Sequence, residues 1–356
     1  MKVVKLRIIV LVLLHVLILT HIYYFGSDVI GSIDFQEFFH AFVKHGVLNS
    51  GGILVLIAFM TTLVFGRFFC GWACHFGAIQ ELCWWLLNKM GLKPKTMDSK
   101  LVTALPLIIL LNFYVIPNIL FAVDHPWQLS LKLNEPEIWE FLPGWAIGSL
   151  TFIIDGFLIV YFLGRKGFCR FICPWGAFLK LPNALAMFKV RKTGNCTHCH
   201  ECTTHCPVGI DVSYEINTYE KVTNTNCTSC LMCTSGCPEN ALSYEFKNPL
   251  NENMKLSQFV QKEQYTHRHI THLFTSVRKH DVWILGLTLI TGLAIDGLYG
   301  MGHFMAFGIA IIAAYFIIKE NQFKILWMKP TLDTLIILLF LWHGTIKFSI
   351  WQGLTQ

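Results

Sequence analysis

Charged residues are scarce in this chain. Lys, Arg, Asp and Glu together make up 14% of the 356 residues, whereas 54% are hydrophobic, and the mean hydropathy is +0.52. A soluble globular domain carries about a quarter charged residues. The composition therefore excludes an ordinary soluble protein. The apolar residues instead fall into blocks of about 20, the length that a helix needs to cross a bilayer.

A signal-peptide cleavage pattern is also missing after the first apolar run. That run follows the basic segment 1–7 and extends to Phe25. It is long, and no small-residue cleavage pattern follows it. We therefore expect the run to be retained as the first membrane-spanning helix.

The apolar blocks predict a polytopic α-helical membrane protein with about seven transmembrane helices. The expected spans are residues 6–25, 47–66, 101–123, 143–163, 282–300, 303–318 and 332–351. A polar segment between the fourth and fifth spans holds an inserted two-cluster ferredoxin-like module. The predicted parts are a membrane domain at 1–188, the module at 189–245, a cytoplasmic linker at 246–281 and C-terminal transmembrane helices at 282–356.

Basic residues predict the orientation of these spans. With a cytoplasmic N-terminus, only Lys44, Lys132 and Lys347 of the 28 Lys and Arg residues fall on the outer side, as the positive-inside rule requires. We expect the bacterial cytoplasmic (inner) membrane, with the module in the reducing cytoplasm, where the 13 cysteines stay thiols. The net charge of +6 is explained by basic loops that face an anionic leaflet, and it requires no nucleic acid.

The most specific pattern lies at 196–238, which reads CTHCHECTTHCP, a spacer and CTSCLMCTSGCP. Both halves give C-x2-C-x2-C-x3-C-P, the bacterial ferredoxin run whose fourth cysteine ligates the other cluster. The expected [4Fe–4S] ligand sets are Cys196, Cys199, Cys202 and Cys237 for one cluster, and Cys206, Cys227, Cys230 and Cys233 for the other. Zinc is the alternative, but zinc sites usually take two C-x2-C pairs and not a row of three cysteines.

An internal repeat adds two more cysteine pairs. GRFFCGWACHFGA matches GFCRFICPWGA later in the chain, and each copy ends a pair of spans. In a helix, positions four apart share a face, so Cys70 with Cys74, and Cys169 with Cys173, each offer two sulfurs to one site. A pseudo-twofold relation would bring all four to a third metal or iron–sulfur site at the membrane surface. Reversible disulfide pairs and simple packing at helix starts stay open as alternatives. The lone Cys83 is expected to be buried.

Ionisable residues within the spans are costly in lipid and often mark functional sites. Oxidation of a quinol releases protons together with electrons, so a quinol site needs a carboxylate or an imidazole near the ring. The candidate catalytic residues are Asp155, Asp124, Asp296 and His303. A purely structural role in the helix bundle is the alternative for each of them.

Histidines in the spans suggest a second possible cofactor, a b-type haem held by two facing imidazoles. The candidate ligands are His15, His21, His303 and His343. No spacing among them favours a specific pair, so we do not expect haem b.

Three phrases together resemble a known family. FCGWACHFGAIQEL, FCRFICPWGAF and the twin ferredoxin runs are similar to the membrane polyferredoxins of the NapH/NosR family, which are [4Fe–4S] proteins of the quinol dehydrogenase type. The phrase CPVGID also looks like the cytochrome oxidase accessory proteins of the CcoG type. The resemblance implies that the eight ferredoxin cysteines are cluster ligands and that the C-x3-C residues are redox-active or metal-binding. His75 departs from the family, which has a proline there, and the partner enzyme stays open.

These observations predict a membrane-bound iron–sulfur protein that passes electrons between the quinone pool and a redox partner enzyme. As an enzyme it would be a quinol dehydrogenase-type oxidoreductase subunit. The alternative is a maturation factor that reduces copper or another cofactor during metalloenzyme assembly. Redox sensing is a third reading, although no DNA-binding or signalling domain supports it. The expected partners are membrane lipid, quinone and a redox protein or metalloenzyme complex.

Overall fold

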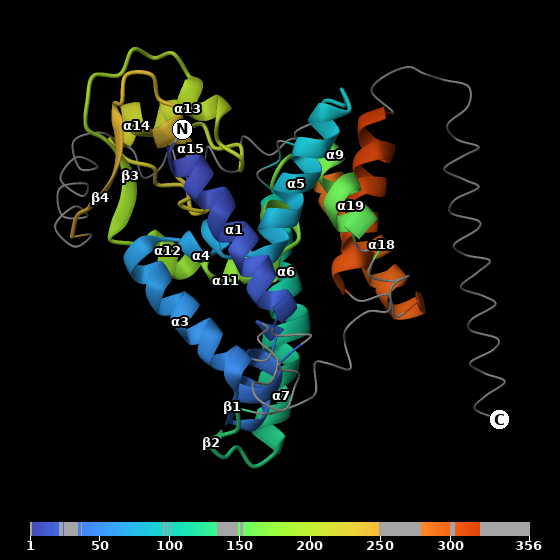
Figure 1. The fold of residues 1–356 in the computed structure, drawn as a ribbon. Helices are drawn as coiled ribbons and strands as arrows, with labels where there is room; N and C mark the ends of the chain where they lie inside the picture. Colours follow the sequence, from blue (N-terminus) through green and yellow to red (C-terminus); the bar gives the residue numbers. More distant parts are fainter. Residues whose placement is uncertain are drawn as a thin grey trace, which may run out of the picture.

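The computed structural model describes residues 2–20, 35–133, 152–248, 279–299 and 303–320, except positions 37, 95, 96, 98 and 100, together with the single positions 24 and 149. Apolar helices form one part, and a small module of strands and short helices sits at one end of it, near the N-terminus (Figure 1). The predicted seventh span, most of the predicted linker and the first part of the predicted fourth span lie outside the described residues.

Three described helical runs are long and apolar enough to cross a membrane. They are α1 (Lys2–Thr20), α18 (Lys279–Tyr299) and the continuous run of η3 (Val102–Ala104), α6 (Leu105–Ile109), η4 (Leu110–Val115) and α7 (Ile116–Asp124). Shorter apolar helices are α3 (Ser50–Phe65), the pair η6 (Phe152–Leu158) and α9 (Ile159–Leu163), and α19 (His303–Glu320). These helices overlap predicted spans, and the three long runs fit a membrane protein, whereas the count of seven and the orientation stay predictions.

The two repeat copies fold alike. In each copy an apolar helix ends at a glycine with positive φ, Gly66 (62°) after α3 and Gly164 (104°) after α9, a conformation that costs glycine little. A helix of about one turn and then a further helix follow in each copy. These are α4 (Phe68–Trp72) and α5 (His75–Lys89) in the first copy, and α10 (Gly167–Phe171), α11 (Pro174–Phe178) and α12 (Lys180–Ala184) in the second.

The apolar helices share one core. Buried side chains from the run α6–η4, from α9 and α10, and from the hairpin of α18 and α19 pack together. Gly292 lets the two hairpin helices approach, because a Cβ there would lie 2.5 Å from the Phe307 ring. Small residues allow such close contact between helices where van der Waals packing drives association. η2 (Phe38–Val43) contributes Phe39 to this core and also packs on α3, and β1 (Val47–Leu48) pairs in parallel with β2 (Ser130–Leu131).

The module is closed by a two-stranded antiparallel sheet. β3 (Phe188–Lys192) pairs with β4 (Leu242–Phe246), with Val190 opposite Tyr244, so the chain enters and leaves the module side by side. The short helices α13 (Glu201–Thr204), α14 (Val212–Tyr219) and α15 (Met232–Ser235) lie between the strands. Their apolar residues form a separate small core with Val190 and Leu242.

Hydrogen bonds fasten the module to the membrane part. The Tyr244 hydroxyl donates to the Phe65 carbonyl oxygen at 2.5 Å, at the end of α3. Trp72 Nε1 in α4 donates to the Ser229 carbonyl oxygen at 3.0 Å. The cysteine loop that contains Ser229 therefore sits directly on the first repeat copy.

Candidate metal centres

Two cavities in the module are each lined by four cysteines. One is lined by Cys206, Cys227, Cys230 and Cys233, and the other by Cys196, Cys199, Cys202 and Cys237. The grouping places the fourth cysteine of each run with the first three of the other, as in two-cluster ferredoxins. The ligation of clusters by these residues stays a prediction.

The two cysteine loops share a backbone conformation. The residues before and after the middle cysteine have positive φ in both loops, His198 (57°) and His200 (60°) in the first, and Ser229 (47°) and Leu231 (59°) in the second. Non-glycine residues held there cost about 1–3 kcal/mol each, and such strain is typical of functional sites. The repeated conformation indicates that both loops are shaped to direct three sulfurs into one cavity.

The C-x3-C cysteines also converge, and we call Cys70, Cys74, Cys169 and Cys173 the membrane site. The prediction that each pair lies on one helix face is wrong. α4 and α10 contain the first cysteine of each pair, whereas the second is the N-cap residue of the next helix, with an extended backbone (ψ 118° for Cys74 and 110° for Cys173). The helix breaks between the two sulfurs, so a turn of the chain and not a shared helix face presents them.

A proline explains this break in one copy only. Pro174 follows Cys173, and the residue before a proline is disfavoured in the α conformation. His75 stands at the equivalent position and the chain breaks there too, with Cys74 extended. The departure of His75 from the family pattern therefore leaves the local geometry intact.

The four thiols of the membrane site are close enough to influence one another. Burial, followed by the nearby Cys169 and Cys70, raises the pKa of Cys74 to about 12. Burial, followed by Cys169 and Cys74, raises the pKa of Cys173 well above its usual range. Metals bind thiolates, so metal binding here must displace the thiol protons.

Two buried cations flank these thiols at equivalent positions of the repeat. Arg67 and Lys166 each stand three residues before the first cysteine of their copy, and they are 1% and 2% exposed. Each reaches into the other copy. A Cβ on Gly176 would lie 3.0 Å from Arg67 Nη2, and Lys166 Nζ donates to the Gly77 carbonyl oxygen at 2.8 Å. Gln80 crosses in the same way, since its Nε2 lies within 3.6 Å of the Sγ of a second-copy cysteine, Cys169.

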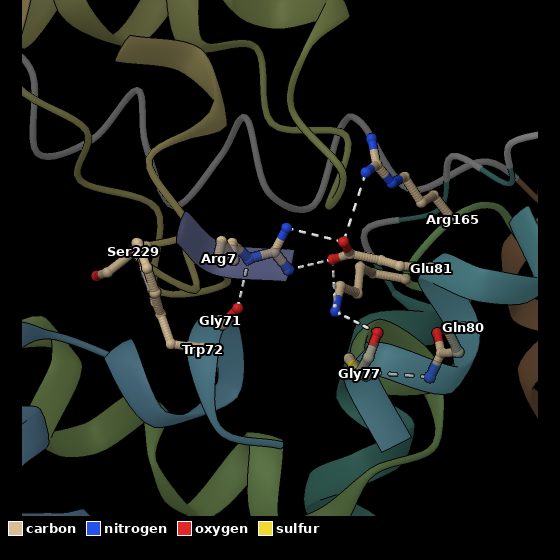
Figure 2. A network of polar contacts seen from close by, with 10 residues as sticks. Arg7, Gly71, Trp72, Gly77, Gln80, Glu81, Arg165 and Ser229 are labelled. Atoms are coloured by element: carbon tan, nitrogen blue, oxygen red, sulfur yellow. Dashed lines mark hydrogen bonds and ion pairs between the residues drawn. The ribbon is translucent and has the colours of Figure 1, made fainter. Parts of the chain in front are cut away.

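The charge of Lys166 is balanced by a carboxylate. Its Nζ lies 3.0 Å from Glu81 Oε1, and Arg7 and Arg165 also point at this carboxylate (Figure 2). Burial alone would raise the pKa of Glu81, but Lys166, Arg7 and Arg165 together lower it to about 2. Arg7 further donates from Nε to the Gly71 carbonyl oxygen at 2.6 Å, so α1 is tied to α4 and α5.

The charge of Arg67 has no such partner. Its Nη1 donates to the Thr225 carbonyl oxygen at 3.3 Å, and its Nη2 lies 3.8 Å from Cys70 Sγ. In the described part of the chain no carboxylate pairs with it, and its Nε has no acceptor. A buried cation without a counter-charge is strongly destabilising. An anionic group among the neighbouring cysteines would supply that counter-charge.

The donor set fits a metal–sulfur cluster better than a single ion. Thiolates hold iron–sulfur clusters, and all 13 cysteines are free thiols in the structure. Among the described residues no group of three or more Cys, His, Asp and Glu side chains is arranged to hold one metal ion, which requires sulfurs about 2.3 Å from a common centre. In the module, where four cysteines line each cavity, an all-cysteine set suits an iron–sulfur cluster.

The membrane site touches the module beside one of its two cysteine cavities. A Cβ on Gly71, the residue after Cys70, would lie 2.3 Å from the Thr228 carbonyl oxygen and 3.2 Å from the backbone of Cys230. A side chain at this position would therefore collide with the cysteine loop. Glycine lets the backbone beside one candidate metal ligand contact the backbone of another.

The structure brings together two of the four candidate catalytic residues. Asp296 Oδ2 lies 2.7 Å from His303 Nδ1. Asp155 in η6 is 1% exposed and faces Gly308 of α19, and among the described residues neither of its carboxylate oxygens has a hydrogen-bond partner. Asp124 is exposed at the last residue of α7. The catalytic roles of all four stay predictions.

Two further expectations concern single residues. Cys83 is 0% exposed, which confirms its predicted burial. His15 Nδ1 contacts the Leu11 carbonyl oxygen at 2.7 Å, a bond within its own helix. His21 and His343, the other residues proposed as haem ligands beside His303, lie outside the described residues.

Arg67, Lys166 and Glu81 were not predicted as site residues from the sequence. A signal for the two cations was present, because both repeat copies carry a basic residue three positions before the first cysteine. Glu81 has no counterpart in the second copy, where Lys180 stands at the equivalent position. Only the folded structure shows that it meets Arg7 and Lys166.

Two family models match the chain. The family described as "4Fe-4S binding domain" matches residues 50–93 and 145–193, the two segments that contain the repeat copies. The family described as "4Fe-4S dicluster domain" matches residues 188–247, which contain the module. No solved structure matches.

Curated relatives match about half of the chain or less. An uncharacterized protein of Methanocaldococcus jannaschii is 29% identical over 51% of this chain and 77% of its own length. The putative electron transport protein YccM of Escherichia coli is 26% identical over 49% of this chain and 51% of its own length. The regulatory protein NosR of Pseudomonas aeruginosa is 27% identical over 41% of this chain and 21% of its own length. The chain thus spans less than two thirds of the latter two relatives.

Proposed function

We propose, on the confirmed resemblance to the membrane polyferredoxins of the NapH/NosR type, that this chain passes electrons between the quinone pool and a redox partner enzyme. The main support for this proposal is the contact between the membrane site and the module at Gly71 and Cys230. This contact joins a thiol site among the apolar helices to the ferredoxin loops. In this proposal the chain works in the bacterial cytoplasmic membrane, with the module on the cytoplasmic side.

Iron–sulfur clusters, when bound, accept and release single electrons. We assign two [4Fe–4S] clusters to the eight module cysteines, in the sets that line the two cavities. The membrane site would hold a third. The support for this third site is the set of four converging cysteines, together with the match of both repeat copies to a 4Fe-4S binding family.

Charge favours the third site as well. A metal cluster held by thiolates carries negative charge, and the buried Arg67 guanidinium lacks a carboxylate partner in the described structure. Cationic donors beside the sulfurs favour the deprotonated thiols that metals need. A neutral disulfide or four neutral thiols would leave the Arg67 charge uncompensated, and burial of an unpaired charge costs several kcal/mol.

Quinol oxidation requires groups that accept protons. Asp155, Asp124, Asp296 and His303 are the candidates, since each lies within or at the end of an apolar helical span. A general base near the reacting hydroxyl typically accelerates proton transfer about 10²–10⁴-fold.

The test uses the purified full chain under anaerobic conditions. Iron per chain is counted first, with about twelve expected for three [4Fe–4S] clusters. A value of about eight with both module clusters intact would overturn the third site. Duroquinol, a soluble quinol, is then added, and cluster reduction is followed by EPR. Clusters that exchange electrons with neither duroquinol nor duroquinone would overturn the quinone role.

A maturation factor that reduces copper is the second candidate. The four thiols of the membrane site favour it, because soft thiolates select Cu(I). In that case each Cu(II) ion would take one electron from a reduced iron–sulfur cluster of the module and be retained as Cu(I) at the membrane site, and dithionite could supply that electron in place of quinol. Measuring copper retained by the iron-loaded chain in the absence of quinol separates this function from the first.

A further inference from the structure

A polar pair joins the two helices of the C-terminal hairpin. Asp296 lies near the end of α18, and His303 is the first residue of α19. Their Oδ2 and Nδ1 atoms are 2.7 Å apart. With Nδ1–H donating to the carboxylate, the ring nitrogen Nε2 carries the lone pair and accepts protons. A carboxylate that orients a histidine in this way also stabilises the imidazolium that forms.

The pair is only partly covered by protein. The His303 side chain is 35% exposed and that of Asp296 is 16% exposed, although both belong to apolar helices. Ionisable groups in such helices are expensive in lipid and usually mark a functional site. One side of the imidazole lies on the Phe113 ring, with the ring centres 3.9 Å apart. The remaining exposed part of His303 is therefore available to a molecule dissolved in the bilayer.

Aromatic contacts lead from this pair to the membrane site. The Tyr114 ring centre lies 6.2 Å from that of His303 and 4.9 Å from that of Trp175. Trp175 belongs to α11, whose N-cap residue is Cys173. Tyr114 lies in η4, a π-helical turn inserted in an otherwise α-helical span, and such insertions are frequent at functional sites.

We infer that Asp296 and His303 form the proton-accepting end of a quinol site, and that Tyr114 and Trp175 connect this site to the cysteines of the membrane site. The inference rests on the proposed function and names its substrate site. Each quinol loses two electrons and two protons to become quinone. The protons leave the two hydroxyl groups one at a time through His303 Nε2, and the two electrons reduce two oxidised iron–sulfur clusters of this chain by one electron each.

Two other ionisable residues in or next to the apolar helices lack an aspartate–histidine pair of this kind. Asp155 faces Gly308, and in the part of the chain that the structure describes no partner orients its carboxylate. His125 follows the α6–α7 run and stacks on Phe121, with ring centres 3.8 Å apart, whereas the His303 ring lies against Phe113 at a comparable distance but tilted by 31°. The Nδ1 atom of His125 contacts the Phe121 carbonyl oxygen. His125 therefore provides a matched control, a stacked histidine without an aspartate partner among its described contacts.

The experiment compares two reductants of the iron-loaded full chain in anaerobic stopped-flow measurements. Duroquinol must lose protons as it reduces the clusters, whereas dithionite does not. For His303→Ala we expect duroquinol reduction to slow about 100-fold or more. Asp296→Asn should slow it about tenfold, as expected of a residue that orients another. Dithionite reduction and iron content should match the unmodified protein, and His125→Ala should behave as unmodified with both reductants.

The aromatic connection is tested separately. Tyr114→Leu should slow duroquinol reduction while leaving dithionite reduction unchanged, and Tyr114→Phe, which keeps the ring, should not. An unchanged duroquinol rate in His303→Ala would overturn the inference while leaving the proposed function in place. Failure of the unmodified protein to exchange electrons with duroquinol or duroquinone would instead overturn the proposed function. A loss of iron or of the dithionite response in His303→Ala would also overturn the inference, because it would show a structural role.

Discussion

The module and the membrane site both gather cysteines, but they do so by different means. In the module, the sulfurs come from short loops in which strained residues such as His200 and Leu231 shape the backbone. In the membrane site, they come from two helix breaks, and the buried cations Arg67 and Lys166 lie among them. The comparison teaches that a thiol site near solvent can be built from local backbone, whereas one among apolar helices must also carry its own counter-charges.

We expect the largest effect from a substitution that removes metal from the membrane site alone and leaves the module intact. If the membrane site holds the proposed third cluster, Cys169→Ser should lower the iron content from about twelve to about eight atoms per chain, because the change removes one proposed ligand of that site and leaves the module untouched. Iron analysis together with EPR of the reduced protein measures this.

Cys83→Ser is the matched control for that change. Cys83 is also buried, at 0% exposed against 9% for Cys169, but it packs with a separate apolar cluster. It should retain all the iron. Equal iron loss in both variants would show that Cys169→Ser acts through general destabilisation.

The second prediction concerns charge. Arg67→Met removes the cation beside Cys70, so a reduced, more negative cluster at the membrane site loses its counter-charge. Its reduction potential should fall by about 60 mV or more, equivalent to a tenfold change in a one-electron equilibrium. Arg67→Lys keeps the positive charge and should lower the reduction potential less. An EPR-monitored redox titration should show the module potentials unchanged, and a shift in the module alone would contradict the assignment.

The third prediction concerns how the folding stability of the membrane part depends on pH. The pKa of Glu81 is about 2 in the folded chain and 4.5 ordinarily, so its stabilising contribution is present above about pH 4.5 and is lost as the pH falls toward 2. Glu81→Gln should cost about 3 kcal/mol of folding free energy at neutral pH and progressively less below pH 4.5. Thermal unfolding in detergent across this range measures it.

Glu201→Gln in the module provides the comparison. Glu201 is half-exposed and pairs only with His205 in the described structure, at 3.6 Å. Exposed pairs contribute little to stability. This variant should unfold like the unmodified protein at every pH, and a cost equal to that of Glu81→Gln would count against a special role for the buried carboxylate.

The smallest expected effect tests the contact between the two regions. Gly71→Ala places a methyl group 2.3 Å from the Thr228 carbonyl oxygen, so the module must move. We expect a cost of about 1–3 kcal/mol from overpacking. Electrons should also pass more slowly from the membrane site to the module. Gly286→Ala, where nothing lies within 4 Å, should change neither thermal stability nor the rate of cluster reduction by duroquinol.

The module could be predicted from sequence because its pattern is local. The spacing in each C-x2-C-x2-C-x3-C run places three sulfurs on one loop, and the exchange of Cys206 and Cys237 between cavities follows from the known ferredoxin rule. The membrane site could be predicted only as a convergence of two similar segments. The two helix breaks within the C-x3-C pairs were not predicted. The break before His75 has no local signal in the sequence, because no proline follows Cys74.

Long-range charge pairing was the least predictable part. Arg7 and Glu81 are far apart in sequence, and no pattern in either segment predicts that the two side chains pair. In the same way, the sequence supplied Asp155, Asp124, Asp296 and His303 as equal candidates. Only the folded structure distinguishes the two that meet, because it brings Asp296, near the end of α18, within hydrogen-bond distance of His303, the first residue of α19.

The crossing of Arg67 and Lys166 between the repeat copies has a consequence for biosynthesis. The first copy leaves the ribosome well before the second, and chains generally fold from the N-terminus onward. Until 166–176 arrives, Cys70 and Cys74 have neither their partner thiols nor the lysine that reaches Gly77. If the membrane site holds a metal, as proposed, its loading has to wait for insertion of the second copy, and an occupied site would then report that both halves of the protein have assembled.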